Sequence, residues 1–254
     1  MFKLTARAGF LLLPPPPSPS NSGRRGDLRR RSRWQVATAI EAAPPATAYD
    51  KSTPLIDLPI LSLDTEATGL DPGSDRIVAI AAAHLQQGKL YLAEALDLLI
   101  DPGQPIPPAV IALHGISDAW VADAIKFVDL AEQLDNRLEG FVLLGHNVHY
   151  DAALLHHEMR RSGRQWQRPP LLDTLLLYAS LYPTAGDLTL DAVAKRFRIS
   201  RAGRHTALGD ALIALDVYFR LLPHLAAKGI LTLGQAETAS SQALERLRHL
   251  SRQA

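Results

Sequence analysis

The chain contains 254 residues, of which 47% are hydrophobic and 21% are charged, and its formal net charge is +1. This composition allows one sizeable hydrophobic core or two small ones, and it excludes collagen-like and wholly disordered chains. The absence of cysteine excludes disulfides, zinc–thiolate centres, iron–sulfur clusters and a cysteine nucleophile. No apolar run approaches the roughly 20 residues that cross a bilayer, so we expect no membrane span. We also expect a cytoplasmic location.

The first 50 residues differ from the rest of the chain in charge, with eight Lys or Arg residues against three Asp or Glu residues. The proline run at 14–17 and the arginine cluster at 29–31 disfavour a packed core. We therefore expect residues 1–55 to form a disordered, basic, proline-rich arm, with a short helix over 34–43. The arm either attracts nucleic acid or is a solvated leader without a binding role, and a downstream translation start is a third interpretation.

Apolar periodicity divides the remaining chain into strands and helices. Short apolar runs predict strands over residues 60–63, 77–83, 90–98 and 141–144. Apolar residues at helical spacing predict helices over residues 127–138, 150–161, 190–197, 208–222 and 239–252. A sheet that begins with a hairpin and continues with alternating helices and strands predicts one α/β domain over 56–224. Residues 225–254 then form a helical tail, whose last helix either pairs with a partner or packs on its own domain.

The first candidate site lies at the end of the 60–63 strand, where Asp64 and Glu66 follow. Side chains at i and i+2 of a strand point to the same face, so the two carboxylates converge. Like charges this close repel unless a cation neutralises them, and an all-oxygen site suits Mg²⁺ or Mn²⁺. The alternative is an ordinary acidic turn at the end of a strand.

Two later carboxylates and a histidine complete the set of candidates. Asp151 follows the 141–144 strand and falls in the first turn of the next helix, where capping is the alternative role. Asp210 lies off the leucine stripe of the 208–222 helix, beside small residues, and can face a cleft. His205 lies about one helical turn earlier, where a surface or capping role is the alternative.

Taken together, the Asp-x-Glu, the Asp after a later strand and the His-x4-Asp occur in the order typical of DEDDh exonucleases. From about residue 58 to 222, the chain resembles this DnaQ-like branch of the RNase H-like fold, including the proofreading epsilon subunits of bacterial DNA polymerase III and their stand-alone relatives. Leu113-His114-Gly115-Ile116 and Asp173-Thr174 resemble two further family segments, whereas Ala67 and Tyr150 depart from frequent family residues. The resemblance implies a mixed five-stranded sheet flanked by helices.

The resemblance also implies two divalent cations, Mg²⁺ or Mn²⁺, held by Asp64, Glu66, Asp151 and Asp210. Asp64 would bridge both ions, Glu66 and Asp210 would hold the ion that carries the attacking water, and Asp151 would serve the second ion. His205 would be the general base, because an imidazole pKa of about 6.5 suits proton transfer near neutrality. We expect six residues to contact the terminal nucleotide: Thr65, Thr68, Gly69, Leu70, His114 and Asn147.

These features predict a 3′→5′ exonuclease that releases nucleoside 5′-monophosphates from single-stranded 3′ ends, with DNA in proofreading or repair as the expected substrate. One alternative is an RNA-directed enzyme of the RNase T or oligoribonuclease type. Another is a non-catalytic module that binds a polymerase or nucleic acid. A DNA polymerase is a candidate partner, although we favour a stand-alone or accessory enzyme because we find no clamp-binding motif after the core. The sequence does not predict the oligomeric state.

Overall fold

The computed structural model describes residues 35–36 and 45–252; the segments outside it are residues 1–34, 37–44 and 253–254. Most of the predicted arm over 1–55, and of the predicted helix over 34–43, therefore lies outside the described residues. The helix prediction is wrong at Gln35–Val36, which form strand β1 because their backbone pairs in parallel with the edge of a neighbouring strand.

Residues 45–55 contact the folded domain rather than extending away from it. Leu55 is 3% exposed, and its carbonyl accepts a hydrogen bond of 2.8 Å from the buried Tyr218 hydroxyl. The Tyr49 hydroxyl donates to the Phe141 carbonyl at 3.2 Å. These contacts hold the segment against the body, so ordered chain begins before the boundary that we expected at residue 55.

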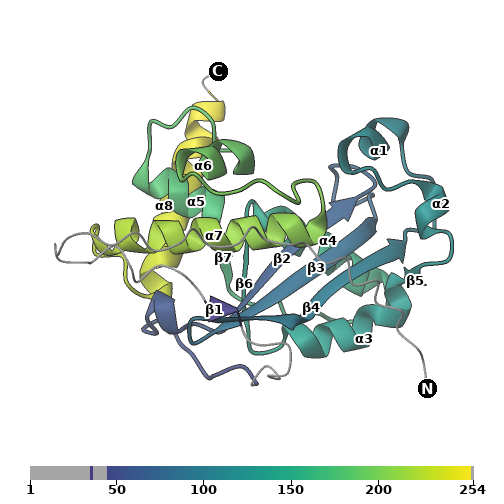
Figure 1. Cartoon of the computed structure of the whole chain (residues 1–254), viewed down its shortest axis with the longest axis horizontal. Coiled ribbons are helices and arrows are strands. Elements are labelled where there is room, and N and C mark those ends of the chain that lie inside the picture. The colour runs from purple at the N-terminus through teal and green to yellow at the C-terminus, as the bar shows by residue number, and fades with distance from the viewer. Residues whose placement is uncertain (1–34, 37–44, 253–254) are drawn as a thin grey trace, which may run out of the picture. The chain divides into compact units, whose positions relative to one another are not determined.

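A mixed sheet forms the centre of the fold (Figure 1), with strand order β1-β4-β3-β2-β6-β7 and with β5 paired to β4. Strands β2, β3 and β4 are antiparallel neighbours, whereas β6 runs parallel to β2 and to β7. The predicted α/β class is confirmed, although the two-residue strands β1 and β5 add to the five strands expected. The other strands are β2 (Ile60–Ala67), β3 (Ile77–Gln86), β4 (Lys89–Asp101), β5 (Ile125–Lys126), β6 (Val142–Gly145) and β7 (Leu171–Asp173).

Helices flank the sheet on both faces (Figure 1). All five helices predicted within the body and tail are present, and the described residues add η1, α1, α2 and α5. The helices are η1 (Leu55–Asp57), α1 (Pro108–His114), α2 (Asp118–Val121), α3 (Phe127–Leu138), α4 (Val148–Arg161), α5 (Thr174–Leu181), α6 (Leu190–Arg196), α7 (Ala207–Ala226) and α8 (Leu233–Ser251).

Alternation along β2 decides which side chains face which helices. The buried Ser62 lies on the α7 side, where its hydroxyl donates to the Ala211 carbonyl at 2.7 Å. Leu63 faces the opposite way and packs into the core that β2 forms with α3 and α4. Because Asp64 and Glu66 keep the parity of Ser62, they lie on the face that α7 covers.

The C-terminal helix α8 is longer than predicted and packs on its own domain. It begins with a capping box between Thr232 and Gln235, and Ala236 is buried in the core cluster that α5 and α7 share. Near its other end, Arg246 Nη2 donates to the Ala179 carbonyl of α5 at 3.0 Å. Of the two interpretations considered for this helix, packing on its own domain is the one observed. Among the residues described, no helix is both long and apolar enough to cross a membrane.

Candidate active site

Three carboxylates meet where β2 ends and α7 begins. One oxygen from each of Asp64, Glu66 and Asp210 lies within 4.8 Å of the other two. Asp64 and Glu66 come from alternate positions of β2, and Asp210 comes from the first turn of α7. The structure thus brings together three of the residues that the sequence analysis assigned to catalysis.

A close backbone approach shapes the start of α7. Thr206 caps the helix, because its hydroxyl accepts a hydrogen bond of 3.1 Å from the Gly209 N–H. A Cβ at Gly209 would lie 1.9 Å from the Gly203 carbonyl oxygen, so no larger residue fits there. Gly203 itself has a left-handed φ of 85°, which glycine adopts readily. The loop is therefore held tightly against the helix turn that carries Asp210.

Asp151 lies in the first turn of α4 and is 5% exposed. Its Oδ1 accepts hydrogen bonds from the Thr65 backbone N–H at 2.9 Å and from the Thr65 hydroxyl at 2.6 Å. The backbone N–H and the hydroxyl of Thr65, a residue that we expected to contact a nucleotide, are thus both engaged inside the protein. Asp151 is not one of the three grouped carboxylates, but its negative charge still raises the pKa of Asp64 and of Glu66.

Burial and mutual repulsion disfavour negative charge at this site. Burial, followed by the charges of Asp151, Asp210 and Glu66, raises the pKa of Asp64 well above its ordinary value. Burial is also the main reason why the pKa of Glu66 rises to about 7. It likewise raises the pKa of Asp151 to about 7, against the opposing effect of the hydrogen bonds from Thr65. Without a counter-charge, these carboxyl groups retain protons that ordinary ones release.

The residues present at the site fit a divalent cation. Oδ1 of Asp210 is buried and has no hydrogen-bond partner among the described residues. A buried oxygen without a partner costs free energy, and a bound cation would satisfy it. Carboxylate oxygens are the ligands that Mg²⁺ and Mn²⁺ prefer, and the positive charge would relieve the repulsion between the three side chains.

The loop before α7 turns His205 outward and Arg204 inward. His205 is exposed, has a left-handed φ of 64°, and is not among the grouped ligand atoms. Nη1 of Arg204 instead donates to Oδ2 of Asp210. Its Nε and Nη2 donate to Oδ2 of Asp191 at 3.2 and 3.0 Å. The sequence analysis missed Arg204 and Asp191, although a basic residue directly before the histidine was a visible signal.

The turn after β2 contains three of the expected substrate contacts. Thr68 is 1% exposed, and its hydroxyl donates to Asp75 at 2.8 Å and accepts from the Arg76 N–H at 3.0 Å. Thr68 therefore braces the turn. A Cβ at Gly69 would lie 2.4 Å from a carboxylate oxygen of Asp75, so a larger residue there would have to displace the Asp75 side chain. Leu70 is 87% exposed, so its side chain is open to a ligand.

The two remaining substrate candidates lie at the starts and ends of helices. His114 closes α1 and is buried; its Nδ1 accepts from the Ile116 N–H at 3.0 Å, and burial lowers its pKa. Its Nε2 has no partner among the described residues. Asn147 has a left-handed φ of 63°, and its backbone N–H donates to Asp173 at 2.9 Å. The Asn147 side chain is exposed, and so is available to a ligand.

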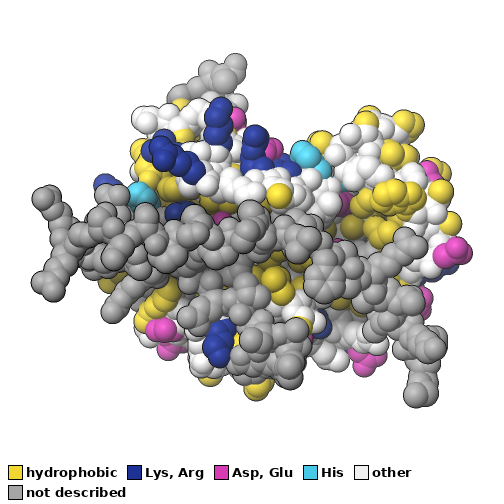
Figure 2. Space-filling view, viewed as in Figure 1, with side chains coloured by type: hydrophobic (Ala, Val, Ile, Leu, Met, Phe, Trp, Pro, Cys, Tyr) yellow, Lys and Arg dark blue, Asp and Glu magenta, His cyan; other side chains and the backbone are white. Residues whose placement is uncertain are grey.

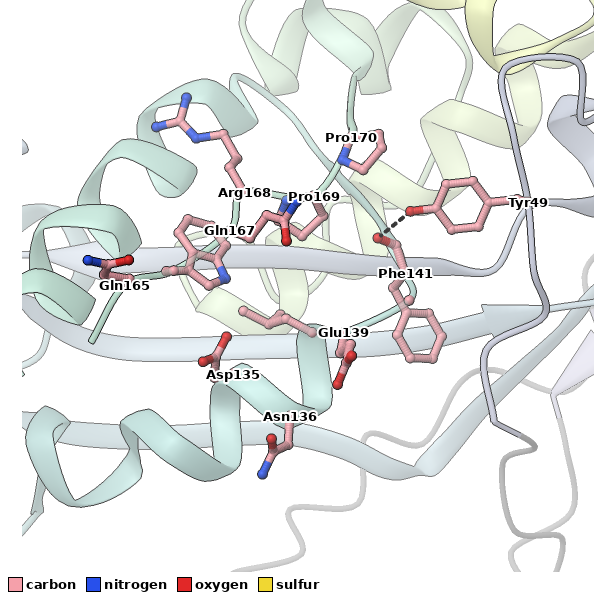
Figure 3. Close-up of a pocket in the computed structure, with 13 residues that line it drawn as sticks. Tyr49, Asp135, Asn136, Glu139, Phe141, Gln165, Gln167, Arg168, Pro169 and Pro170 are labelled. Carbon is pink, nitrogen blue, oxygen red and sulfur yellow. Dashed lines mark hydrogen bonds between the residues drawn. The ribbon is translucent and has the colours of Figure 1, made fainter.

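A separate pocket lies at the other end of the sheet, where β6 and β7 begin. It has a volume of about 420 Å³ and lies between the end of α3 and residues 165–170. Figure 3 shows the Tyr49 hydroxyl pointing to the Phe141 carbonyl at the side of this pocket. None of the predicted site residues lines it. Because the carboxylates lie at the opposite ends of the parallel strands, we do not include this pocket in the candidate active site.

Comparison with known sequences identifies the family. Residues 61–218 match the family described as exonuclease, and this segment contains all five catalytic candidates. The chain belongs to the exonuclease family. It is 40% identical over 189 residues to the DNA polymerase III subunit epsilon-like protein of Rhodobacter capsulatus. It is 32% identical over 167 residues to the DNA polymerase III subunit epsilon of Rickettsia conorii. The predicted relationship is therefore confirmed.

These relatives differ in how much of them the chain covers. The match spans 73% of this chain and 27% of the Rhodobacter protein. It spans 63% of this chain and 72% of the Rickettsia protein. For the DNA polymerase III PolC-type of Lacticaseibacillus paracasei, which is 30% identical, it spans 77% of this chain and 13% of that protein. The chain thus corresponds to a limited part of two of the three relatives.

Solved structures share the fold. Exonuclease X in complex with 5′ overhanging duplex DNA superposes with a TM-score of 0.54 at 23% identity, covering 71% of this chain and 99% of that chain. E. coli exonuclease I in complex with a dT13 oligonucleotide superposes with a TM-score of 0.59 at 17% identity, covering 68% of this chain and 42% of that chain. The predicted RNase H-like exonuclease fold is confirmed.

Proposed function

We propose that this exonuclease uses divalent metal to remove nucleotides from the 3′ end of DNA, and that it releases nucleoside 5′-monophosphates. The observation that carries this proposal is the meeting of Asp64, Glu66 and Asp210, whose buried Oδ1 has no partner in the described part of the chain, within the segment that matches the exonuclease family. Such a cluster is unfavourable when empty of positive charge, and becomes favourable once it holds cations that can receive a phosphate.

The proposed cofactors are two divalent cations, Mg²⁺ or Mn²⁺. When bound, they would activate the attacking water and offset the negative charge of the phosphodiester. Asp64, Glu66 and Asp210 supply carboxylate oxygens on the α7 side of β2. Asp151 would contribute from α4, and its two hydrogen bonds from Thr65 fix the direction of its carboxylate.

His205 is the proposed general base, which accepts the proton of the attacking water. The residue before it, Arg204, contacts Asp210, and the residue after it, Thr206, caps α7. The imidazole is therefore carried by a short segment that is held at both sides next to the carboxylates. Its exposure leaves it accessible to substrate and water.

Exposed basic side chains on the segment that leads to the site suit a polyanionic substrate. Lys195, Arg198 and Arg201 are exposed at the end of α6 and in the loop that leads to α7, and Arg201 contacts Asp191, the partner of Arg204. Figure 2 shows Lys and Arg side chains gathered over this region of the molecule. Phosphate contacts of this kind supply affinity without reading sequence, as a nuclease that acts on any terminus requires. The exposed Leu70 is proposed to contact the terminal nucleotide.

DNA is the proposed substrate because the names of the relatives point to it. They include DNA polymerase III subunits, and two structures with the same fold contain DNA. No residue named above distinguishes deoxyribose from ribose by a hydrogen bond. Preference for RNA is therefore the alternative outcome of the same assay.

The test is an exonuclease assay on 5′-labelled single-stranded DNA and RNA of the same sequence. Full-length protein is stripped with EDTA and then supplied with Mg²⁺ or Mn²⁺. We expect stepwise shortening of DNA from its 3′ end, faster than that of RNA, with 5′-phosphorylated mononucleotides as the product. No shortening of either strand would contradict the proposed activity, and faster cleavage of RNA would replace the proposed substrate.

His205→Ala tests the proposed base in the same assay. We expect the rate to fall by about 10²- to 10⁴-fold, because that is the usual contribution of a positioned general base. His249→Ala, near the end of α8, is the matched histidine control and should keep the wild-type rate. Full activity of His205→Ala would remove the base from the proposal while leaving the metal site intact.

Association with a DNA polymerase is proposed from the names of the relatives alone. In this chain, the apolar face of α8 is used on its own domain, which supports an enzyme that also acts without a polymerase. An affinity pull-down with the full chain distinguishes the two: stoichiometric recovery of a replicative polymerase supports a subunit, and its absence supports a stand-alone enzyme.

A further inference from the structure

Arg204 lies between two carboxylates with different surroundings. Its Nη1 donates to Oδ2 of Asp210, one of the grouped carboxylates, and its Nε and Nη2 donate to Oδ2 of Asp191 at 3.2 and 3.0 Å. The Arg204 side chain is 17% exposed, that of Asp210 is 10% exposed, and that of Asp191 is 37% exposed. The guanidinium therefore connects the candidate metal site to a carboxylate on the first turn of α6.

The backbone beneath Arg204 is held in place. The Gly203 carbonyl approaches Gly209 so closely that a Cβ there would overlap it, and the Thr206 hydroxyl donates to the same carbonyl at 2.7 Å. The loop thus packs against the first turn of α7 on both sides of Arg204. A change at the site must therefore move the guanidinium by side-chain rotation rather than by withdrawal of the loop.

The guanidinium is the positive charge that the structure itself places among these carboxylates. Its charge lowers the pKa of Asp64 and of Glu66, against burial and the neighbouring acids, which raise both. It occupies one oxygen of Asp210, while the other oxygen of the same carboxylate has no partner among the described residues. A divalent cation at this site would therefore meet a cation already in contact with one of its ligands.

We propose that Arg204 is a built-in counter-ion that competes with divalent metal for Asp210, and that Asp191 retains the guanidinium when metal binds. The inference rests on the proposed metal site and adds a residue that sets its affinity. A bidentate contact suits this exchange, because the planar guanidinium keeps two donors on Asp191 while a third leaves Asp210. Asp191 is thus a positioning residue that acts through Arg204.

Calorimetric titration of Mn²⁺ into the EDTA-treated full chain tests the exchange. Arg204→Gln should bind Mn²⁺ about tenfold more tightly than wild type, because the competing cation is gone. Asp191→Asn should bind it about threefold more weakly, because the displaced guanidinium loses its charged acceptor. Arg204→Lys keeps the positive charge but not the planar pair of donors to Asp191, and its Mn²⁺ affinity should lie between those of wild type and Arg204→Gln.

Arg201→Gln is the matched control. Arg201 lies in the same loop and contacts the same Asp191 through Nη1 at 3.3 Å, but its side chain is 56% exposed and makes no contact with Asp210. Its loss should change Mn²⁺ affinity by less than about twofold, because exposed charges are screened. An equal gain of affinity in Arg201→Gln and Arg204→Gln would overturn the inference in favour of a general field effect.

The double variant and the metal-free protein provide the remaining readouts. In the Arg204→Gln background, Asp191→Asn should no longer weaken Mn²⁺ binding. Without metal, Arg204→Gln should unfold at a lower temperature than wild type, and saturating Mn²⁺ should remove this difference. Unchanged or weaker Mn²⁺ binding by Arg204→Gln would overturn the inference about Arg204 but would leave the proposed function standing. Absence of Mn²⁺ binding by wild type would overturn both the proposed function and the inference.

Discussion

Two groups of acidic side chains on neighbouring elements differ in the counter-charges around them. Glu158, on α4, is 1% exposed, yet its two oxygens accept from Arg76 Nε at 2.6 Å and Nη2 at 3.1 Å. At the end of β2, Asp64 and Glu66 instead face one another and Asp210. Arg161 Nη1 also lies 3.5 Å from Oε1 of Glu158, so the first group sets one acid against two cations, whereas the second is a collection of like charges.

The presence or absence of a full counter-charge separates a structural carboxylate from a functional one. Glu158 links α4 to the start of β3 through Arg76, so the fold supplies its counter-charge permanently. The β2 group has only a partial counter-charge, from Arg204, and the pKa of Glu66 rises to about 7 because burial and its acidic neighbours disfavour ionisation. Stability that a paired arrangement would supply is given up there, which leaves oxygens free for a ligand.

The largest effect is expected from a substitution in the carboxylate cluster at the end of β2. Asp64→Asn should lower the exonuclease rate by at least about a hundredfold, because it removes a charged oxygen ligand from the proposed two-metal site. Single-turnover rates on 5′-labelled DNA in Mn²⁺ measure this loss. Glu158→Gln, assayed at a temperature at which it is folded, is the control and should keep most of the rate. Comparable losses of exonuclease rate in Asp64→Asn and Glu158→Gln would contradict the assignment of catalysis to the β2 carboxylates and of a structural role to Glu158.

The next-largest effect is expected on stability, from the loss of the Glu158 carboxylate on α4. Glu158→Gln should lower the free energy of unfolding by about 2 to 4 kcal/mol, because it leaves Arg76 and Arg161 without their charged partner in a largely buried setting. Urea denaturation measures the change. A loss below about 0.5 kcal/mol, the usual size for exposed pairs, would show that this contact is no stronger than a surface salt bridge.

A smaller effect depends on pH in EDTA. The pKa of Glu66 is about 7 in the folded protein against an ordinary value of 4.5, so its contribution to stability is complete below about pH 4.5 and is lost as pH rises through about 7. Wild type should therefore lose stability relative to Glu66→Gln over this interval, by about 1 kcal/mol after solvent screening. A constant difference between the two proteins across the interval would contradict the raised pKa.

Strand parity and chain order made much of this site predictable. Asp64 and Glu66 had to share a face of β2 because they are two residues apart, and α7 covers that face. The family order of the motifs indicated Asp151 and Asp210 as their companions. Apolar periodicity predicted four of the strands and five of the helices, with errors in their ends, and it missed the short strands β1, β5 and β7 and the helices η1, α1, α2 and α5.

Other features depend on contacts between distant segments and could not be read from the sequence. Thr65 and Thr68 looked like substrate contacts, but their hydroxyls find partners on Asp151 and on the turn before β3. The inward position of Arg204 follows from the close approach of Gly203 to α7, which no local pattern indicates. Such contacts between distant segments are therefore visible in the fold but not in motif spacing.

The free energy of unfolding of Asp64→Asn in EDTA tests the central claim most directly. The claim is that this cluster lowers stability until a cation fills it. We predict that the free energy of unfolding of the metal-free variant equals that of wild type or exceeds it by up to about 1 kcal/mol, because one of the repelling charges is removed. Saturating Mn²⁺ should then stabilise wild type more than the variant. A metal-free Asp64→Asn that is destabilised as strongly as Glu158→Gln would contradict the account.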